Sequence, residues 1–179
     1  MKSRVIANCG LEVSEIGLGT MTWGRDTDEY EAREQFDLFT QDGGTFIDTA
    51  DVYSDGQAEI LLGQFIAEND VISRDDLVIS TKGGRIRNAD RAINNTLSHL
   101  TKSLDASLHR LNLDFVDIYF IHAYDEFTPL GAIAENLAKI LDTDKARYVA
   151  VSNFKAWQIS YIASELNSSR LIAAQNEYS

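Results

Sequence analysis

FVDIYFIHA, at residues 115–123, carries apolar side chains on both of its faces. A strand that is apolar on both faces must be covered on both, which is typical of buried parallel sheets. The sequence therefore predicts a parallel sheet built from this run and others like it. The other short runs are IGLGT at residues 16–20, TFIDTA at 45–50, DLVISTK at 76–82, RYVAVSN at 147–153 and LIAAQNEY at 171–178.

Segments with helical spacing separate these runs. The clearest lies at residues 91–111, where leucine and isoleucine recur every three or four residues along one face. Thr128 and Pro129 suit the cap and first turn of another helix. Strands that alternate with helices through short connections indicate parallel βαβ units. The expected helices are Asp28–Thr40, Gln57–Asn69, Arg91–Leu111, Thr128–Leu141 and Ala156–Leu166.

Two architectures fit this alternation. Helices on one outer face of a curling sheet make a (β/α) barrel, and helices on both faces make an open doubly wound sheet. The open sheet of dinucleotide-binding proteins carries a G-x-G-x-x-G fingerprint after its first strand. Gly17 and Gly19 are present here, but Thr22 stands where the third glycine belongs. We therefore expect the barrel.

Composition excludes several classes of function. The chain of 179 residues has 16 Lys and Arg against 28 Asp and Glu, so its formal net charge is −12. This acidic balance argues against nonspecific nucleic-acid binding and against an anionic membrane surface. Cys9 is the single cysteine, which excludes an internal disulfide. No apolar run approaches the about 20 residues that span a bilayer, and residues 1–15 do not resemble a secretory signal, so we expect a cytoplasmic protein.

Polar side chains follow the apolar runs at the points where parallel strands end. The active site of a parallel α/β barrel collects at the carboxyl ends of its strands. An acid, a phenol, an amine, an imidazole and amides are therefore expected at one mouth, a set that suits proton transfer. An ammonium ion beside a phenol stabilises the phenolate, and a carboxylate keeps the ammonium charged and in place. These residues are Asp48, Tyr53, Lys82, His122, Asn153 and Gln175.

Each of these residues also has an ordinary interpretation. A single lysine, aspartate or histidine at a strand end is solvated in most proteins, and only their joint occurrence on successive strands favours a site. The rival enzyme class on the same barrel is a metal-dependent hydrolase. That class needs paired histidines, and none of the three histidines lies within metal-ligand spacing of another. We therefore expect no metal.

The chain resembles the aldo-keto reductase superfamily, from about Val5 to Ser179. The motifs occur in order and at the family's spacing. Two positions depart from the pattern, Asp144 and Ala150, where relatives usually have glycine. The resemblance implies a (β/α)8 barrel of the TIM type that reduces carbonyl groups with NADPH. The motifs are GLEVSEIGLGTMTWG at 10–24, FIDTADVYS at 46–54, GQAEILLG at 56–63, VISTKGG at 78–84, VDIYFIHAYD at 116–125, RYVAVSNF at 147–154 and QNEYS at 175–179.

The resemblance also implies roles for individual residues. It makes Asp48, Tyr53, Lys82 and His122 a catalytic tetrad. Other matched positions would hold the nicotinamide. Its carboxamide would be bound by Ser152, Asn153 and Gln175. The loop after the first strand would lie beside the ring, with Gly19, Thr20 and Met21. Trp23 would stand at the substrate mouth.

The length departs most from the family pattern. A complete barrel has eight strands and typically about 250 residues. We therefore expect residues 1–179 to form a single domain, the N-terminal portion of an incomplete barrel with about six βα units and without the last strands. In the family, the loops that bind the adenosine part of the cofactor follow those last strands. A chain with a net charge of −12 is poorly suited to hold that polyanion alone.

Three functions remain open. The first is an NADPH-dependent reductase of a small carbonyl substrate, or its N-terminal part. The second is a cofactor-binding regulatory subunit, because some relatives serve ion channels as β-subunits and keep the tetrad. The third is an inactive barrel fragment. For an open barrel we also expect self-association through its first and last strands, since unpaired edges recruit other chains.

Overall fold

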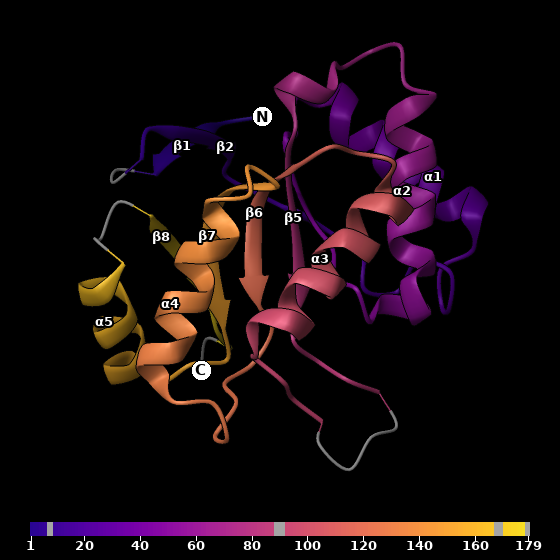
Figure 1. Cartoon of the computed structure of the whole chain (residues 1–179). Helices are drawn as coiled ribbons and strands as arrows, with labels where there is room; N and C mark the ends of the chain where they lie inside the picture. Colours follow the sequence, from indigo (N-terminus) through magenta and orange to yellow (C-terminus); the bar gives the residue numbers. More distant parts are fainter. Residues whose placement is uncertain (7–8, 88–91, 167–169, 178–179) are drawn as a thin grey trace.

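A parallel sheet of six strands forms the centre of the chain (Figure 1). The structure is a computed structural model that describes residues 1–6, 9–87, 92–166 and 170–177. Each strand pairs with the next one along the chain, in the order β3-β4-β5-β6-β7-β8. This order is what successive βαβ units produce. The strands are β3 (Leu18–Gly19), β4 (Phe46–Asp48), β5 (Val78–Gly83), β6 (Val116–Ile121), β7 (Ala146–Ser152) and β8 (Leu171–Gln175).

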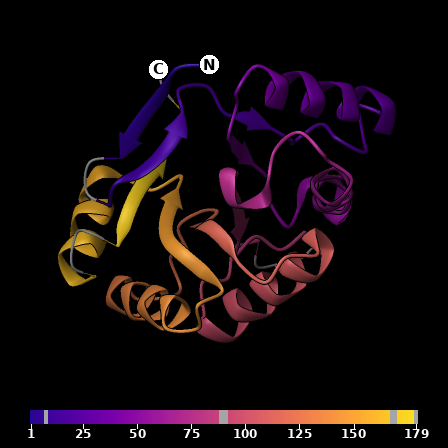
Figure 2. The same cartoon turned by 90° about the horizontal axis from the view of Figure 1, so that it is seen from above.

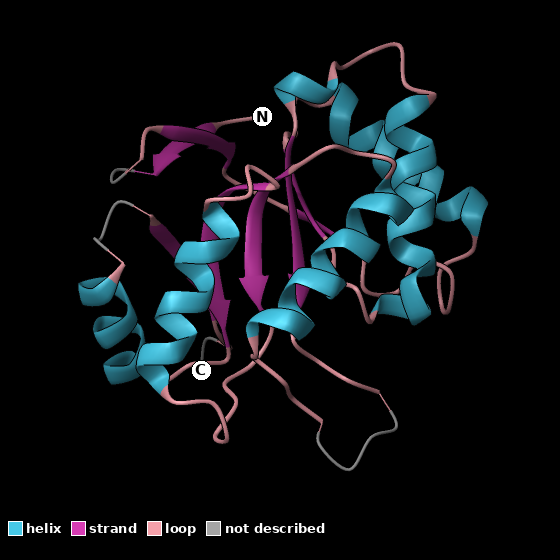
Figure 3. Cartoon of the chain, in the orientation of Figure 1, coloured by secondary structure: helices cyan, strands magenta, loops and turns pink. Residues whose placement is uncertain are grey.

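Helices connect the strands (Figure 3). Helix α1 begins after Asp28, whose side chain accepts a hydrogen bond from the Glu31 amide. Two short 3₁₀ turns, Tyr53–Gly56 and Arg74–Asp76, precede α2 and β5. The helices are α1 (Glu29–Gln41), α2 (Gln57–Ala67), α3 (Leu97–Leu111), α4 (Leu130–Leu141) and α5 (Ala156–Glu165).

Two helix starts differ from the sequence expectation. Helix α3 begins at Leu97 rather than near Arg91, which lies outside the described residues. Ile93 matches the apolar period but forms a β-bridge with Arg85 instead. Helix α4 has Pro129 as its cap residue, so Pro129 is not the first helical residue. The Thr128 hydroxyl bonds to Asp125 rather than capping the helix.

The sheet curls, and the helices lie on its outer side (Figure 2). The larger apolar core fills the layer between helices and strands, with Leu100, Leu104 and Leu108 of α3 against it. A smaller apolar cluster lies on the inner face, where Val78, Ile118, Phe120 and Ala150 meet. The expectation of an incomplete (β/α)8 barrel is confirmed: the sheet is a curled half-barrel, not an open doubly wound sheet.

An N-terminal hairpin, which the sequence reading missed, precedes the half-barrel. Strands β1 (Ser3–Ile6) and β2 (Leu11–Ser14) pair antiparallel. The Ser14 hydroxyl accepts hydrogen bonds from the amides of Thr45 and Phe46, each 3.1 Å long. Leu11 and Val13 pack against the inner apolar cluster. The hairpin therefore covers the end of the half-barrel at which β4 begins.

Asp144 has a φ of 59°, in the left-handed region. It ends the turn between α4 and β7, so the glycine that relatives usually carry there answers a backbone requirement. Asparagine and aspartate tolerate this conformation better than other side chains. Among the described residues, no helix is both long and apolar enough to cross a bilayer.

Candidate active site

Lys82 is the centre of the polar cluster at the carboxyl ends of the strands. Its side chain is 1% exposed, and its ammonium donates to Asp48 Oδ2 at 2.6 Å. The same nitrogen donates to the Thr49 carbonyl at 2.9 Å and to the Tyr53 hydroxyl oxygen at 3.2 Å. The Ser80 hydroxyl donates a hydrogen bond of 2.6 Å to the other carboxylate oxygen, Asp48 Oδ1. A buried ammonium that is fully paired in this way is fixed in position.

The loop that carries Tyr53 is fastened to strand β5. The Thr49 amide donates to the Ser80 carbonyl, and the Asp51 amide donates to the Lys82 carbonyl. After Tyr53 the backbone turns sharply through Ser54, Asp55 and Gly56, with φ values of 49°, 56° and 91°. Non-glycine residues in this region cost about 1 kcal/mol or more each. The turn directs the chain into α2 and leaves the phenol over the end of β5.

His122 lies across the cluster from Tyr53. The two rings are 6.0 Å apart between centroids and nearly perpendicular. His122 is 8% exposed, and its Nδ1 atom is buried with no hydrogen-bond partner in the described part of the chain. Burial, together with the positive charges of Lys82 and Arg85, lowers the pKa of His122 to about 4. The imidazole is therefore neutral at physiological pH and can donate one hydrogen bond and accept another.

The residues expected to hold a nicotinamide gather at the ends of β7, β8 and β3. Asn153 donates its side-chain amide to the His122 carbonyl and to Ser152 Oγ, at 2.9 and 3.0 Å. Its own backbone amide donates to the Gln175 carbonyl. Gln175 Nε2 donates to Asp48 Oδ2 at 3.1 Å, which links this group to the Lys82 cluster.

The loop after β3 joins the same group. Thr20 is buried and donates both its amide and its hydroxyl to the Asp48 carbonyl. A side chain built on Gly19 would meet no atom within 4 Å, so the space above this glycine is open. Met21 is 54% exposed and faces the cavity described below.

Trp23 lies elsewhere. It is 0% exposed, its indole nitrogen donates to Gln35 of α1 at 2.8 Å, and its ring packs edge-on against Phe65 of α2. The structure therefore places this side chain in the core between helices and not with the other expected site residues.

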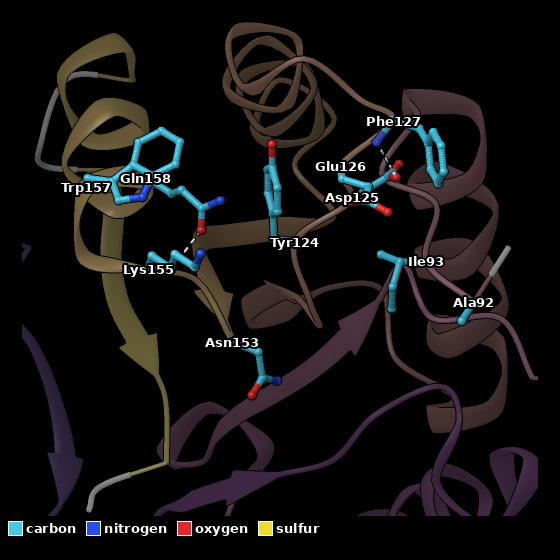
Figure 4. Close-up of a pocket in the computed structure, with 10 residues that line it drawn as sticks. All are labelled: Ala92, Ile93, Tyr124, Asp125, Glu126, Phe127, Asn153, Lys155, Trp157 and Gln158. Carbon is cyan, nitrogen blue, oxygen red and sulfur yellow. Dashed lines mark hydrogen bonds between the residues drawn. The ribbon is translucent and has the colours of Figure 1, made fainter.

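Several cavities open near the carboxyl ends of the strands in the described part of the chain, and two of them are lined by expected site residues. One, of about 430 Å³, is lined by Tyr53 and His122 and by three arginines, Arg25, Arg85 and Arg87. The second, of about 710 Å³, lies between the loops that follow β6 and β7 (Figure 4). Tyr124, Phe127 and Trp157 face it together with polar residues that include Asn153. Both volumes lie in the range of about 300–1,000 Å³ that small-molecule sites occupy.

A buried charged cluster supports the Tyr53 loop from behind. Glu59 is fully buried, accepts a hydrogen bond from Thr81 at 2.5 Å and pairs with Arg110. Asp51 lies close by, and burial, reinforced by the charge of Glu59, raises the pKa of its carboxyl to about 7. This cluster lies on the helix side of the sheet and does not line the 430 Å³ cavity.

The sequence reading missed the arginines of the smaller cavity and the aromatic residues of the larger one. GGRIR at residues 83–87 runs from the last residue of β5 into the next loop. Because the loops after barrel strands form the active site, this position indicates that Arg85 and Arg87 lie at the site. The same rule points to Arg25, which lies in the loop between β3 and α1. Among the described residues, no group of three histidine, cysteine, aspartate or glutamate side chains is placed to hold a metal ion.

The curled parallel sheet and the polar cluster at the carboxyl ends of its strands define an α/β-barrel class of protein. The family model for the aldo/keto reductase family matches residues 15–179, and the chain belongs to this family. Members of the family generally use nicotinamide cofactors.

Named relatives agree with this assignment. The chain is 34% identical over 171 residues to aldo-keto reductase YhdN of Bacillus subtilis, an alignment that covers 89% of this chain and 49% of that protein. It is 30% identical over 167 residues to norsolorinic acid reductase of Aspergillus flavus, covering 86% and 42%. It is 34% identical over 164 residues to a probable voltage-gated potassium channel subunit beta of Arabidopsis thaliana, covering 89% and 49%. The chain spans about half the length of these relatives.

Proposed function

We propose that the protein carrying this chain reduces aldehydes or ketones to alcohols with NADPH. The observation that carries the proposal is the Lys82 ammonium, which lies 2.6 Å from Asp48 and 3.2 Å from the Tyr53 hydroxyl at the mouth of the half-barrel. Tyr53 and His122 face one cavity of about 430 Å³, where a small carbonyl compound has room. Membership of the aldo/keto reductase family supports the same chemistry.

Each side chain has a defined task in this proposal. Tyr53 donates its hydroxyl proton to the carbonyl oxygen as that oxygen gains negative charge. Lys82 hydrogen-bonds the phenol oxygen and stabilises it after the proton has left, and Asp48 keeps the ammonium in place. The neutral imidazole of His122 orients the carbonyl oxygen. NADPH, when bound, supplies the hydride.

The residues at the nicotinamide end fit a flat carboxamide-bearing ring. The space above Gly19 is open, and the amide groups of Asn153 and Gln175 lie at adjacent strand ends. Ser152 and Met21 complete this side of the site. Binding of the cofactor's phosphates requires positive charge or exposed backbone amides. With a net charge of −12, we expect these 179 residues alone to bind NADPH weakly.

The second candidate is a cofactor-binding regulatory subunit. It is favoured by the similarity to a relative named as a probable potassium channel subunit beta. Steady-state reduction of an aldehyde distinguishes the two, because a purely regulatory subunit binds the cofactor without turnover. Absence of both binding and turnover would indicate an inactive fragment. That residues 1–179 act as a single cytoplasmic domain stays a prediction.

Tyr53→Phe tests the proposed reaction. This change removes the hydroxyl proton and keeps the ring, so kcat for a small aldehyde is expected to fall by about 10²–10⁴-fold. Tyr30→Phe is the matched control, since Tyr30 is 79% exposed on α1. Loss of turnover in both variants, or in neither, would contradict the assignment of Tyr53.

A further inference from the structure

The charge of the cavity at Tyr53 is opposite to that of the chain. Among the described residues, its wall contains Arg25, Arg85 and Arg87 and no aspartate or glutamate. The chain as a whole carries a formal charge of −12. A basic wall in an acidic protein raises the local concentration of anions at that wall.

Two of the three arginines already have carboxylate partners. Arg25 pairs with its neighbour Asp26 at 2.5 Å. Arg87 pairs with Asp55 of the Tyr53 loop at 2.7 Å. Arg85 has no acidic partner in residues 1–6, 9–87, 92–166 and 170–177. Its guanidinium, with five donors in a fixed fork, is the group on this wall best suited to bind an added anion.

The backbone under Arg85 is anchored although the side chain is exposed. Gly84 turns the chain with a φ of 100°, and Arg85 bridges to Ile93 through backbone atoms. The guanidinium is also close enough to His122 to lower the pKa of that imidazole. Arg85 lines the cavity of the proposed proton donor and also a neighbouring cavity of about 330 Å³. Because its charge acts on His122, an anion held by Arg85 can lie in the cavity that contains Tyr53.

We propose that the site selects carbonyl substrates that carry a second, anionic group, with Arg85 binding the carboxylate while the carbonyl lies at Tyr53 and His122. This inference rests on the proposed function and adds the substrate class. A carboxylate matches the planar fork of arginine through two parallel hydrogen bonds. Substrates without the anion would leave Arg85 without a partner in the complex.

A phosphate of the cofactor is the other possible anion. Its site is expected on the opposite side of the mouth, because the nicotinamide residues lie at the ends of β3, β7 and β8. Arg85 follows β5, in the middle of the sheet order β3-β4-β5-β6-β7-β8. The arrangement favours the substrate, and the experiments below separate the two sources.

The first experiment measures binding without turnover. NMR spectra of the chain, with the His122 ring and the arginine side chains assigned, are titrated with 4-hydroxybutanoate and with its neutral amide. The carboxylate is expected to shift the His122 and Arg85 signals and to bind about 10- to 100-fold more weakly to Arg85→Ala, as hydrogen bonds to charged groups imply. Equal binding of the acid and the amide would overturn the proposal.

The second experiment measures selectivity in turnover. The ratio of kcat/KM for 4-oxobutanoate to kcat/KM for its methyl ester is expected to fall at least tenfold in Arg85→Ala, mainly through KM, while the ester alone changes little. Arg85→Lys should retain part of the preference, since it keeps the charge and loses the fork. Arg170→Ala is the control: Arg170 is exposed and precedes β8 at the opposite end of the sheet.

The outcomes separate this inference from the proposed function. If no carbonyl compound is reduced, the proposed function fails, and the NMR titration still decides whether Arg85 binds a carboxylate. If Arg85→Ala weakens NADPH binding and leaves the acid-to-ester ratio unchanged, Arg85 serves the cofactor and the substrate proposal is wrong. A fall in the acid-to-ester ratio of kcat/KM in Arg85→Ala, with unchanged NADPH affinity, supports the substrate proposal.

Discussion

The inner and the edge strands of this half-barrel differ in what surrounds them. All six residues of β5 and all six of β6 are buried, whereas β8 becomes exposed toward Gln175 and β3 toward Gly19. The residues proposed for proton transfer depend mainly on the inner strands, and those proposed for the nicotinamide lie largely at the edges. The residues proposed for proton transfer therefore lie mainly at covered strands, while those proposed for the nicotinamide border open sheet edges.

Lys82→Met is expected to have the largest effect on the inner strands. The change removes the Lys82 hydrogen bonds to Asp48, Thr49 and Tyr53 and leaves the Asp48 carboxylate, which is 13% exposed, without its ion pair. Breaking one partner of a buried pair costs about 3–5 kcal/mol. Urea denaturation should show this loss in the free energy of unfolding, and turnover should disappear.

A double variant isolates the cause of that loss. Combining Lys82→Met with Asp48→Asn removes both charges, so part of the lost stability should return while turnover stays absent. A Lys82→Met protein as stable as the wild type would show that Asp48 does not depend on Lys82.

The sequence predicted the inner strands and their polar ends because both follow local rules. FVDIYFIHA and DLVISTK are too apolar for any place except a covered sheet, and parallel strands in sequential order bring their carboxyl ends together. The contact of Lys82 with Asp48 follows from that order, whereas the contact with Tyr53 also needs the loop that the Thr49 and Asp51 amides fasten to β5. Where each helix lies was predictable from its apolar period, except at the starts of α3 and α4.

The features that escaped the sequence reading depend on contacts between distant residues. The hairpin β1-β2 is mostly exposed, and Ser14 fixes it to Thr45 and Phe46, which nothing in residues 1–15 reveals. Trp23 is buried because α1 supplies Gln35 as an acceptor and α2 supplies Phe65. Ile93 fits a helical period, yet the turn at Gly84 places it beside Arg85.

Asp51→Asn is expected to have an intermediate effect, which depends on pH. Burial, with the charge of Glu59, raises the pKa of Asp51 from 3.8 to about 7, so the folded chain holds this proton more tightly than the unfolded chain. Ionisation of Asp51 therefore lowers stability as the pH rises from about 4 to about 7. At about 1.4 kcal/mol for each pH unit, the upper limit of this penalty is about 4 kcal/mol.

The asparagine variant removes that penalty. The difference in unfolding free energy, variant minus wild type, should grow between pH 4 and pH 7 and become constant above it. Taking the difference cancels the opposite contribution of His122, whose lowered pKa makes stability rise with pH between about 4 and its ordinary value of 6.5. Asp70→Asn, at an exposed position after α2, should give a difference that does not change with pH. A flat difference for Asp51→Asn would show that Asp51 is ionised throughout.

Ala173→Lys tests the edge strands and is expected to have the smallest effect on the fold itself. Ala173 is half-buried on β8, pairs in register with Ala150, and packs against the inner apolar cluster. We predict that the 179-residue chain self-associates through β3 and β8, because a second copy would pair their open edges and cover this cluster. Burial of apolar surface contributes about 25 cal/mol per Å² to such an interface.

A lysine at Ala173 can reach solvent in the isolated chain but would have to be buried in a dimer. Sedimentation velocity at several concentrations should therefore show dimers for the wild type and monomers for Ala173→Lys, with nearly equal melting temperatures. Lys2→Ala, in the exposed N-terminal segment, serves as a control that should leave the dimer intact. A wild-type chain that sediments as a compact monomer at every concentration would show that the hairpin and the loops already protect the edges.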